Sequence, residues 1–188
     1  MIIGFVGKKQ SGKSTACSIV EGDLPDVVRI NMKDALVAEM KKNFPNTIAS
    51  LGALIGTVNC EADFTADKLF ETKPTTFRHF MQEYGTEVRR GDKESYWTDQ
   101  WKAKVVKALE EGKHIVVDDV RFLNEADAIK KMGGVIVRIS RTDLKDTDTH
   151  ASEMEMDQIV PNYKFEVGPG ELDLLTLKVR SIYKHLAE

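Results

Sequence analysis

The chain has 188 residues, a formal net charge of −3, 41% hydrophobic residues and 30% charged residues. This length predicts a single domain that can bury a core, and the composition is typical of a soluble globular protein. The slightly acidic balance argues against a nucleic-acid partner, because a nucleic-acid-binding surface is broadly basic. The apolar stretches are too short for a membrane helix or a signal peptide, so we expect a cytoplasmic protein without a membrane partner.

Five short apolar segments are expected to form β-strands. They cover residues 2–6, 27–30, 115–117, 135–139 and 163–167. The last segment alternates apolar and polar residues, which predicts a half-exposed strand. Because helical segments separate these strands, the sequence predicts an α/β fold with a mainly parallel five-stranded sheet and helices on both faces.

Helical patterns fill the spaces between the strands. Helices are expected at 13–20, 33–43, 47–56, 75–90, 98–112, 124–132 and 172–186. Thr98 and Asn124 are the expected N-caps of two of them. The apolar stripe of the 75–90 helix consists of Phe77, Phe80, Met81, Tyr84 and Val88. Residues 57–73 are polar and are expected to be irregular.

Residues 7–14 match the phosphate-loop pattern G-x-x-x-x-G-K-[ST] at every fixed position. A buried strand before the motif and a helix after it are the context that this loop requires. Its backbone N–H groups and the helix N-terminus would bind the β-phosphate of ATP, while Lys13 reaches the β- and γ-phosphates and Ser14 is a magnesium ligand. The expected ATP-binding residues are Gly7, Ser11, Gly12, Lys13, Ser14 and Thr15.

Asp118 and Asp119 follow the expected 115–117 strand, where a phosphate loop usually has its second magnesium element. Alternation along the strand puts the two carboxylates on opposite faces. One of them should therefore hold a magnesium-bound water, and the other should cap a helix or form an ion pair. Arg121 follows at the ligand-binding edge of the sheet and could grip a phosphate, or form a salt bridge to Glu125.

Several segments resemble the phage-type deoxynucleoside monophosphate kinases. Residues 118–126 resemble the D-V-R-F-x-N-E-A signature, and residues 78–87 resemble an R-x-x-x-Q-x-x-G-T-E helix. Residues 150–153 resemble an H-x-S-E motif. Residues 31–36 resemble an F-A-D-P-L segment, with Met-Lys in place of Phe-Ala and Ala in place of Pro. The regular acid of the signature falls on Asp119, which favours Asp119 as the main carboxylate.

The resemblance implies transfer of the γ-phosphoryl group from ATP, with Mg²⁺, to a deoxynucleoside 5′-monophosphate. The section 31–112 is too long for a simple crossover, so it is the expected acceptor-binding part of one domain, 1–188. The implied catalytic residues are Lys13, Asp119, Arg121 and Arg141. The implied substrate-binding residues are Asp34, Arg78, Gln82, Arg89, Arg121, His150 and Glu153. Gln82 would bind the base, and Asp34 is either an acceptor ligand or a helix-start carboxylate.

Residues 141–153 are expected to form a lid that starts at Arg141 and is latched by His150 and Glu153. Gly168 and Gly170 are expected to lie in a turn beside the adenine, by analogy with similar folds. If the chain is phage-encoded, it would act in the host cytoplasm, and the sequence leaves open whether it forms a homodimer.

Two rival functions remain open. Other small-molecule kinases, of the dephospho-coenzyme A or phosphomevalonate type, share the phosphate loop and the strand-end acid. A nucleotide-dependent switch would bind without transferring phosphate, but the N-K-x-D signature of a guanine site is missing from the sequence. The 78–87 segment favours the deoxynucleotide kinase.

Overall fold

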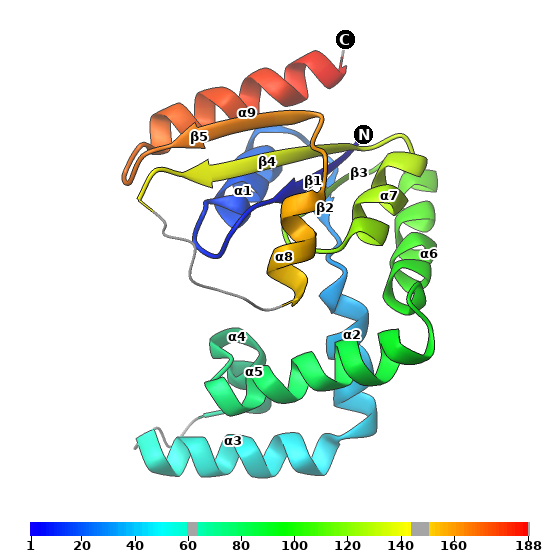
Figure 1. The fold of residues 1–188 in the computed structure, drawn as a ribbon, viewed down its shortest axis with the longest axis vertical. Helices are drawn as coiled ribbons and strands as arrows, with labels where there is room; N and C mark the ends of the chain where they lie inside the picture. Colours follow the sequence, from blue (N-terminus) through cyan, green and yellow to red (C-terminus); the bar gives the residue numbers. More distant parts are fainter. Residues whose placement is uncertain (60–63, 144–150, 188) are drawn as a thin grey trace. The chain divides into compact units, whose positions relative to one another are not determined.

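A computed structural model describes residues 1–59, 64–143 and 151–187 (Figure 1). The chain divides into two compact units. Unit 1 comprises Met1–Met32 and Thr98–Glu188, and unit 2 comprises Lys33–Trp97. Within the described ranges, no helix is long and apolar enough to cross a membrane.

Unit 1 is built on a five-stranded sheet in which neighbouring strands are parallel. The strands are β1 (Ile2–Val6), β2 (Val27–Arg29), β3 (His114–Val117), β4 (Val135–Arg141) and β5 (Tyr163–Val167). Their order is β2-β3-β1-β4-β5, which puts β1 in the centre. The predicted α/β class and five-stranded sheet are therefore confirmed, and the carboxyl ends of all the strands share one edge of the sheet.

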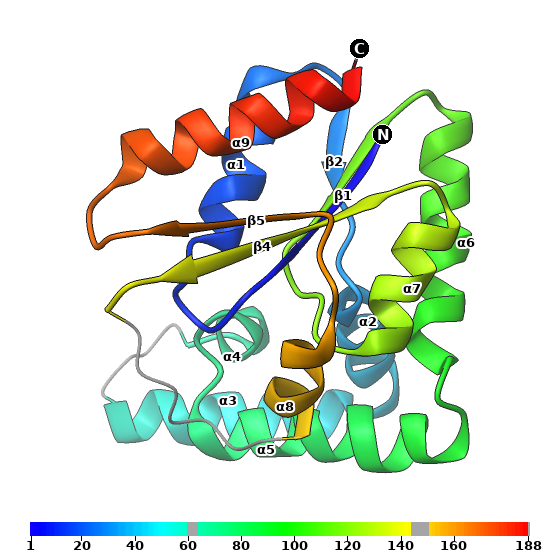
Figure 2. The ribbon, with the colours of Figure 1, turned by 45° about the horizontal axis from the view of Figure 1, so that its top comes forward.

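Helices cover both faces of this sheet, because side chains alternate along each strand. Ile3 and Phe5 of β1 face a core shared with α1 and α9, whereas Ile2 and Val6 face a core shared with α6, α7 and α8. These helices are α1 (Lys13–Asp23), α6 (Tyr96–Glu110), α7 (Leu123–Lys131), α8 (Ala151–Gln158) and α9 (Leu172–Ala187). Figure 2 shows α1 and α9 on one side of the sheet and α7 and α8 on the other.

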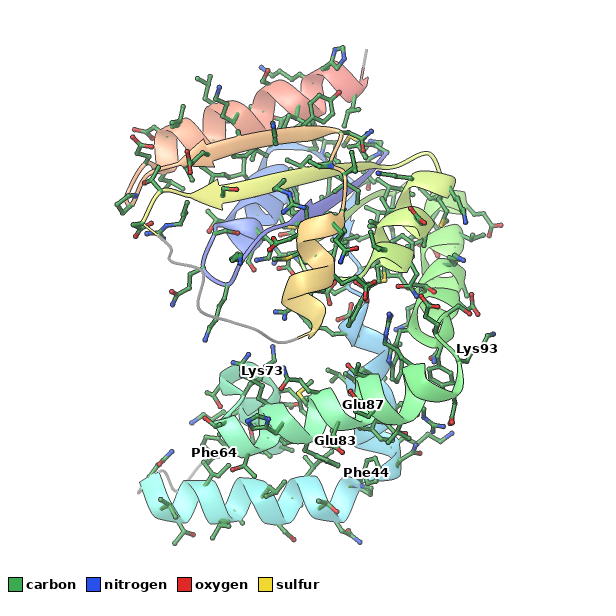
Figure 3. All side chains as sticks on the ribbon, in the orientation of Figure 1. Phe44, Phe64, Lys73, Glu83, Glu87 and Lys93 are labelled. Carbon is green, nitrogen blue, oxygen red and sulfur yellow. The ribbon has the colours of Figure 1, made fainter. Side chains whose placement is uncertain are left out.

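The described part of unit 2 is helical. It contains α2 (Lys33–Asn43), α3 (Pro45–Asn59), α4 (Ala66–Thr72), α5 (Thr75–Gln82) and the π-helix η1 (Glu83–Arg90). Its core includes the buried side chains of Leu69, Phe77 and Tyr84. Phe44, at the junction of α2 and α3 in Figure 3, packs edge-on against Tyr84 with ring centroids 5.0 Å apart. Aromatic contacts therefore tie the two ends of this unit's sequence together.

The expectation that residues 57–73 are irregular was wrong. Helix α3 continues to Asn59, and α4 occupies Ala66–Thr72. The Thr65 side chain caps α4 by accepting the Lys68 N–H, and Leu69 is fully buried. The signal was weak because a helix this short offers few apolar positions, and its stability comes from tertiary packing.

The apolar stripe predicted for residues 75–90 fails at its last position. Val88 is 45% exposed, although Tyr84 is buried. The helix changes to π geometry at Glu83, so hydrogen bonds run from residue i to i+5 instead of i+4. Residue 89 therefore takes the place beside Tyr84 that an α-helix would give to residue 88.

The two predicted N-caps also differ from the structure. Helix α6 begins at Tyr96, so Thr98 lies inside it and is buried. Helix α7 begins at Leu123, which places Asn124 in its first turn. The capping role belongs to Glu125, whose carboxylate accepts the N–H of Phe122 over 3.1 Å. A glutamate at the third helical position can reach back in this way.

Candidate functional site

The loop after β1 has the backbone geometry of a phosphate cradle. Gly7 has a φ of 153°, and a Cβ there would lie 2.2 Å from the carbonyl oxygen of Ile139. Gly12 has a φ of 101° at the start of α1, and Gln10 has a φ of 65°, which is uncommon for a non-glycine residue. Such turns aim successive backbone N–H groups toward one point, where they can bind an anion.

Lys13 is folded onto this loop. Its Nζ donates to the carbonyl oxygens of Gly7 at 2.6 Å and Lys8 at 2.7 Å. The ammonium group is therefore held at the cradle by hydrogen bonds that phosphate oxygens could replace. Ser14 and Thr15 begin the same helix, and their side chains are exposed.

The buried hydroxyl of Ser11 is a second feature of this loop that is typical of a ligand-binding site. The residue is 1% exposed, and among the described residues its Oγ has no hydrogen-bond partner. A buried hydroxyl left unpaired costs about 1–3 kcal/mol. Native structures keep such groups rarely, and a binding site is one of the usual reasons. The cradle therefore fits the phosphates of a nucleotide.

A cavity of about 310 Å³ adjoins the loop. It is lined by residues 10–15, by Arg141 and by the segment from β5 to α9, which includes Gly168, Gly170 and Leu175. The turn at Gly168 is closed by Glu171, whose carboxylate accepts the Gly168 N–H. The turn expected beside the adenine thus lines the same cavity as the phosphate loop.

Arg141 ends β4 and lines this cavity. Its Nε and Nη2 donate to the Asp143 carboxylate at 2.9 and 2.7 Å, and its Nη1 donates to the carbonyl oxygen of Gln10 at 3.3 Å. The hydrogen bonds from Arg141 hold the pKa of Asp143 below its usual value. The guanidinium therefore lies against the phosphate loop with an internal carboxylate as its counterion.

Both predicted carboxylates at the end of β3 are tied to the segment that follows β2. Asp118 is 7% exposed, and its N–H donates to the side chain of Asn31 at 3.0 Å. The Asp119 carboxylate accepts the Met32 N–H, also at 3.0 Å. These bonds fix the carboxyl ends of β2 and β3 side by side.

No motif in the sequence singles out Arg29. Its Nη1 donates to Asp118 at 3.0 Å, and its Nη2 reaches the carbonyl oxygen of Ser14 at 3.4 Å. Nε donates to Glu21 at 3.0 Å, and this hydrogen-bonded pair raises the pKa of the guanidinium. One side chain therefore links the strand-end carboxylate to the helix that follows the phosphate loop, and Asp118 lies on the α1 face of the sheet.

Arg121 lies in the turn before α7. Its backbone N–H donates to Glu125 at 2.8 Å, and the Glu125 side chain is buried beneath the turn. This contact uses the Arg121 backbone, so Glu125 shapes the turn that carries the guanidinium.

No group of three or more metal-binding side chains occurs among the described residues. Mg²⁺ nevertheless fits the carboxylates at the end of β3, because it needs only one or two carboxylates besides phosphates and water.

Unit 2 contains four of the residues expected to bind the acceptor, namely Asp34, Arg78, Gln82 and Arg89. Arg78 and Gln82 lie one turn apart on α5 and are half-buried. Neither side chain has a hydrogen bond or ion pair within the described ranges, which leaves both available to a ligand. Asp34 lies in the first turn of α2, the helix-start position that was the alternative to an acceptor ligand.

Arg89 lies in a polar cluster that sequence reasoning missed. Its Nε donates to Glu39 at 2.6 Å and to the Tyr84 hydroxyl at 3.1 Å. The same Glu39 carboxylate accepts the hydroxyl groups of Tyr84 and Tyr96. The two remaining predicted residues give no test: His150 lies outside the described residues, and Glu153 falls on α8 with its side chain likewise outside the description.

A model of the deoxynucleotide monophosphate kinase family matches residues 26–162, which is well over half of the chain. The chain belongs to this family. The match confirms the resemblance seen in residues 78–87 and 118–126, and it indicates a nucleotide kinase. The matched range starts after the phosphate loop, so the loop is evidence for nucleotide-phosphate binding that is independent of the family match.

Two individual comparisons accompany the family match, one in sequence and one in fold. A protein of Acanthamoeba polyphaga mimivirus that bears the name "Putative deoxynucleotide monophosphate kinase" is 30% identical over 169 residues, which cover 85% of this chain and 83% of the viral protein. The crystal structure of TT1252 from Thermus thermophilus has a TM-score of 0.52 and 14% identity, and the match covers 99% of this chain and 97% of that one. This second likeness concerns the fold alone.

Proposed function

We propose that the protein transfers the γ-phosphoryl group of ATP to a deoxynucleoside 5′-monophosphate, which yields the deoxynucleoside diphosphate and ADP. The observation that carries this proposal is the phosphate loop, in which Lys13 lies on the loop carbonyls and the buried Ser11 hydroxyl has no partner among the described residues. The family match supplies the class of acceptor.

The donor would be bound by unit 1. The triphosphate would replace the carbonyl partners of Lys13 and accept the backbone N–H groups of the loop. The adenine would enter the cavity toward Gly168 and Leu175. Arg141, which already lies against Gln10, would exchange Asp143 for a phosphate oxygen as charge develops on the transferring group.

Mg²⁺ would neutralise charge on the β- and γ-phosphates when bound there, with the Ser14 hydroxyl as a ligand and an aspartate holding a bound water. The resemblance favours Asp119 for that aspartate. We assign the role to Asp118, because Arg29 links its carboxylate to the Ser14 turn. Asp119 would then fix the end of β2 through the Met32 N–H.

The acceptor would be bound by unit 2, with Arg78 and Arg89 on its phosphate and Gln82 on its base. Half-buried polar groups without internal partners discriminate well between bases, because a wrong base leaves them unpaired. The attacking phosphate oxygen is already ionised, so the reaction needs no general base. The task of the protein is to bring two anions together and to offset their charge. Arg121 would serve that purpose at the end of β3.

The test is ADP release from ATP and Mg²⁺ with a panel of deoxy- and ribonucleoside monophosphates. We expect turnover with one or more deoxynucleotides and none with the Lys13→Met variant, whose circular dichroism and melting temperature should match the wild type. Silence across the panel, with ATP still bound, would contradict a deoxynucleotide acceptor. Dephospho-coenzyme A would then be the next acceptor to assay.

A further inference from the structure

Glu39 is the centre of a half-buried hydrogen-bond cluster in unit 2. Its Oε1 accepts from Arg89 Nε at 2.6 Å and from the Tyr84 hydroxyl, and its Oε2 accepts from the Tyr96 hydroxyl at 2.6 Å. The side chain is 14% exposed. Burial alone would raise the pKa of Glu39, but these three donors outweigh it and hold the pKa below its usual value. The carboxylate is therefore charged at neutral pH.

The π-helix places Arg89 in this cluster. Tyr84 and Arg89 are five residues apart, which is the spacing that stacks side chains on one face of a π-helix. The guanidinium carbon lies 5.3 Å from the Tyr84 ring centroid and 5.2 Å from that of Tyr96. In an uninterrupted α-helix, Val88 would take this position. The unusual helix thus has a definite consequence, because it orients an arginine between two aromatic rings.

The cluster holds only one end of the Arg89 guanidinium. Nε bonds to Glu39 and Tyr84, while Nη1 and Nη2 make no hydrogen bond within the described ranges. The side chain is 29% exposed. A guanidinium fixed at Nε and between two rings keeps a planar pair of donors, which matches the oxygens of a phosphate. Its conformational entropy is already largely lost before a ligand arrives.

We infer that Glu39, Tyr84 and Tyr96 are positioning residues that hold Arg89 ready to bind the phosphate group of the acceptor nucleotide. This inference rests on the proposed function for the identity of the acceptor, and it adds residues that neither the motifs nor the resemblance pointed to. The three residues act through Arg89 and need not touch the substrate. Tyr84 is itself held by Asn43, whose Nδ2 donates to the Tyr84 hydroxyl at 3.1 Å.

The experiment compares Glu39→Gln, Tyr96→Phe and Arg89→Lys with the wild type, using a deoxynucleotide of the panel that the wild type binds in calorimetry. Each variant is assayed for the KM of the deoxynucleotide, the KM of ATP and the melting temperature. We expect the deoxynucleotide KM to rise about tenfold in Glu39→Gln, which is the effect of losing one charge-assisted hydrogen bond. The ATP KM should change less than about twofold, because ATP binds to the other unit.

A matched control is Glu83→Gln. Glu83 lies on η1 at a variable position of the 78–87 segment, is exposed (labelled in Figure 3), and has no ion pair within the described ranges. It should leave both KM values and the melting temperature unchanged. The Tyr96→Phe variant keeps the ring beside Arg89 and removes only the hydrogen bond from the hydroxyl to Glu39. We therefore expect this variant to fold like the wild type. A smaller rise in the deoxynucleotide KM with an unchanged melting temperature is expected there.

A double variant separates positioning from a merely structural role. If Glu39 acts through Arg89, Glu39→Gln should add less than about twofold to the deoxynucleotide KM once Arg89→Lys is present. Additive effects, or equal losses for ATP and deoxynucleotide, would overturn the inference.

Calorimetric binding of the deoxynucleotide to the same variants distinguishes this inference from the proposed function. Binding that weakens in Glu39→Gln but never leads to turnover in the wild type would support the positioning role and contradict the kinase reaction. Turnover in the wild type with undiminished binding in Glu39→Gln would support the kinase reaction and contradict the positioning role.

Discussion

Arg29 and Asp118 form an ion pair at 3.0 Å although they are 89 residues apart in the sequence. The same guanidinium bonds to the Ser14 carbonyl oxygen and to Glu21, both on α1. The end of β3 is thereby joined to the first turn of the helix that follows the phosphate loop. This link explains how a carboxylate can keep a fixed place beside the expected magnesium ligand before any nucleotide is bound.

Replacing Arg29 by Met should weaken both stability and phosphoryl transfer. Asp118 is 7% exposed, so removing Arg29 takes an ion-pair partner away from a buried carboxylate. We expect the free energy of unfolding to fall by about 1–3 kcal/mol, because the pair is only partly buried. Urea titration measures this change, and kcat should fall at least about tenfold in the same variant.

The double variant Arg29→Met with Asp118→Asn is the control for this pair. Neutralising Asp118 removes the buried charge that has lost this ion pair, so the double variant should be more stable than Arg29→Met alone. Stability losses that simply add would show that the two side chains do not depend on each other.

The two aspartates at the end of β3 should differ in their effect on catalysis. Asp118→Asn should lower kcat about 100-fold and raise the Mg²⁺ concentration needed for half-maximal rate, because it removes a charge beside the metal. Asp119→Asn should cost less, since its amide oxygen can still accept the Met32 N–H. Rates titrated with Mg²⁺ compare the two, and a larger loss in Asp119→Asn would transfer the metal role to that residue.

Asp143 should compete with ATP for Arg141. The guanidinium donates from Nε and Nη2 to Asp143, and this exposed ion pair is weak because water screens it. Asp143→Asn should therefore lower the KM of ATP, by no more than about fivefold, while the deoxynucleotide KM stays constant. Steady-state kinetics at low and high salt provide the measurement. A higher KM for ATP would mean that Asp143 assists nucleotide binding.

Asp23 should contribute to stability in a pH-dependent way. Its carboxylate accepts from Arg180 at 2.7 and 2.8 Å and from Tyr183 at 2.9 Å, and these bonds join α1 to α9. They lower the pKa of Asp23 from 3.8 to about 2. A folded-state pKa below the unfolded value means that the contribution is complete above about pH 4 and is lost as the pH falls toward 2.

Urea midpoints of the wild type and Asp23→Asn measure this contribution. The variant should be less stable at pH 7, and the difference should shrink below about pH 4. Asp127→Asn is the matched control, because Asp127 is exposed on α7 and has no ion pair within the described residues. A difference that stays constant from pH 7 to pH 3 would contradict the role of the Asp23 charge.

The sheet and the donor site could be predicted because their signals are local. A buried strand such as β1 appears as an unbroken apolar run, and the phosphate loop needs Gly7 and Gly12 at fixed spacing for its backbone. The alternation rule predicted different surroundings for Asp118 and Asp119, and their carboxylates have different partners, Arg29 and the Met32 N–H. It did not reveal which of them faces α1, because that depends on Arg29, which lies on another strand.

The residues that sequence reasoning missed depend on contacts between distant segments. Glu39 meets Tyr84 and Tyr96 at separations of 45 and 57 residues, and an isolated glutamate on a helix gives no sign of this. The π-helix was hidden for a different reason. Tyr84 and Val88 have ordinary helical spacing, so the pattern predicts an α-helix as far as Arg90, whereas the structure changes to π geometry at Glu83.

The most direct test of the kinase reaction is to follow labelled phosphate from γ-labelled ATP in the presence of Mg²⁺ and a deoxynucleoside monophosphate. We expect the label to appear in the deoxynucleoside diphosphate with the wild type, and we expect no labelled product with Lys13→Met. Label released only as inorganic phosphate, or retained in ATP with every deoxynucleotide offered, would contradict transfer to this acceptor.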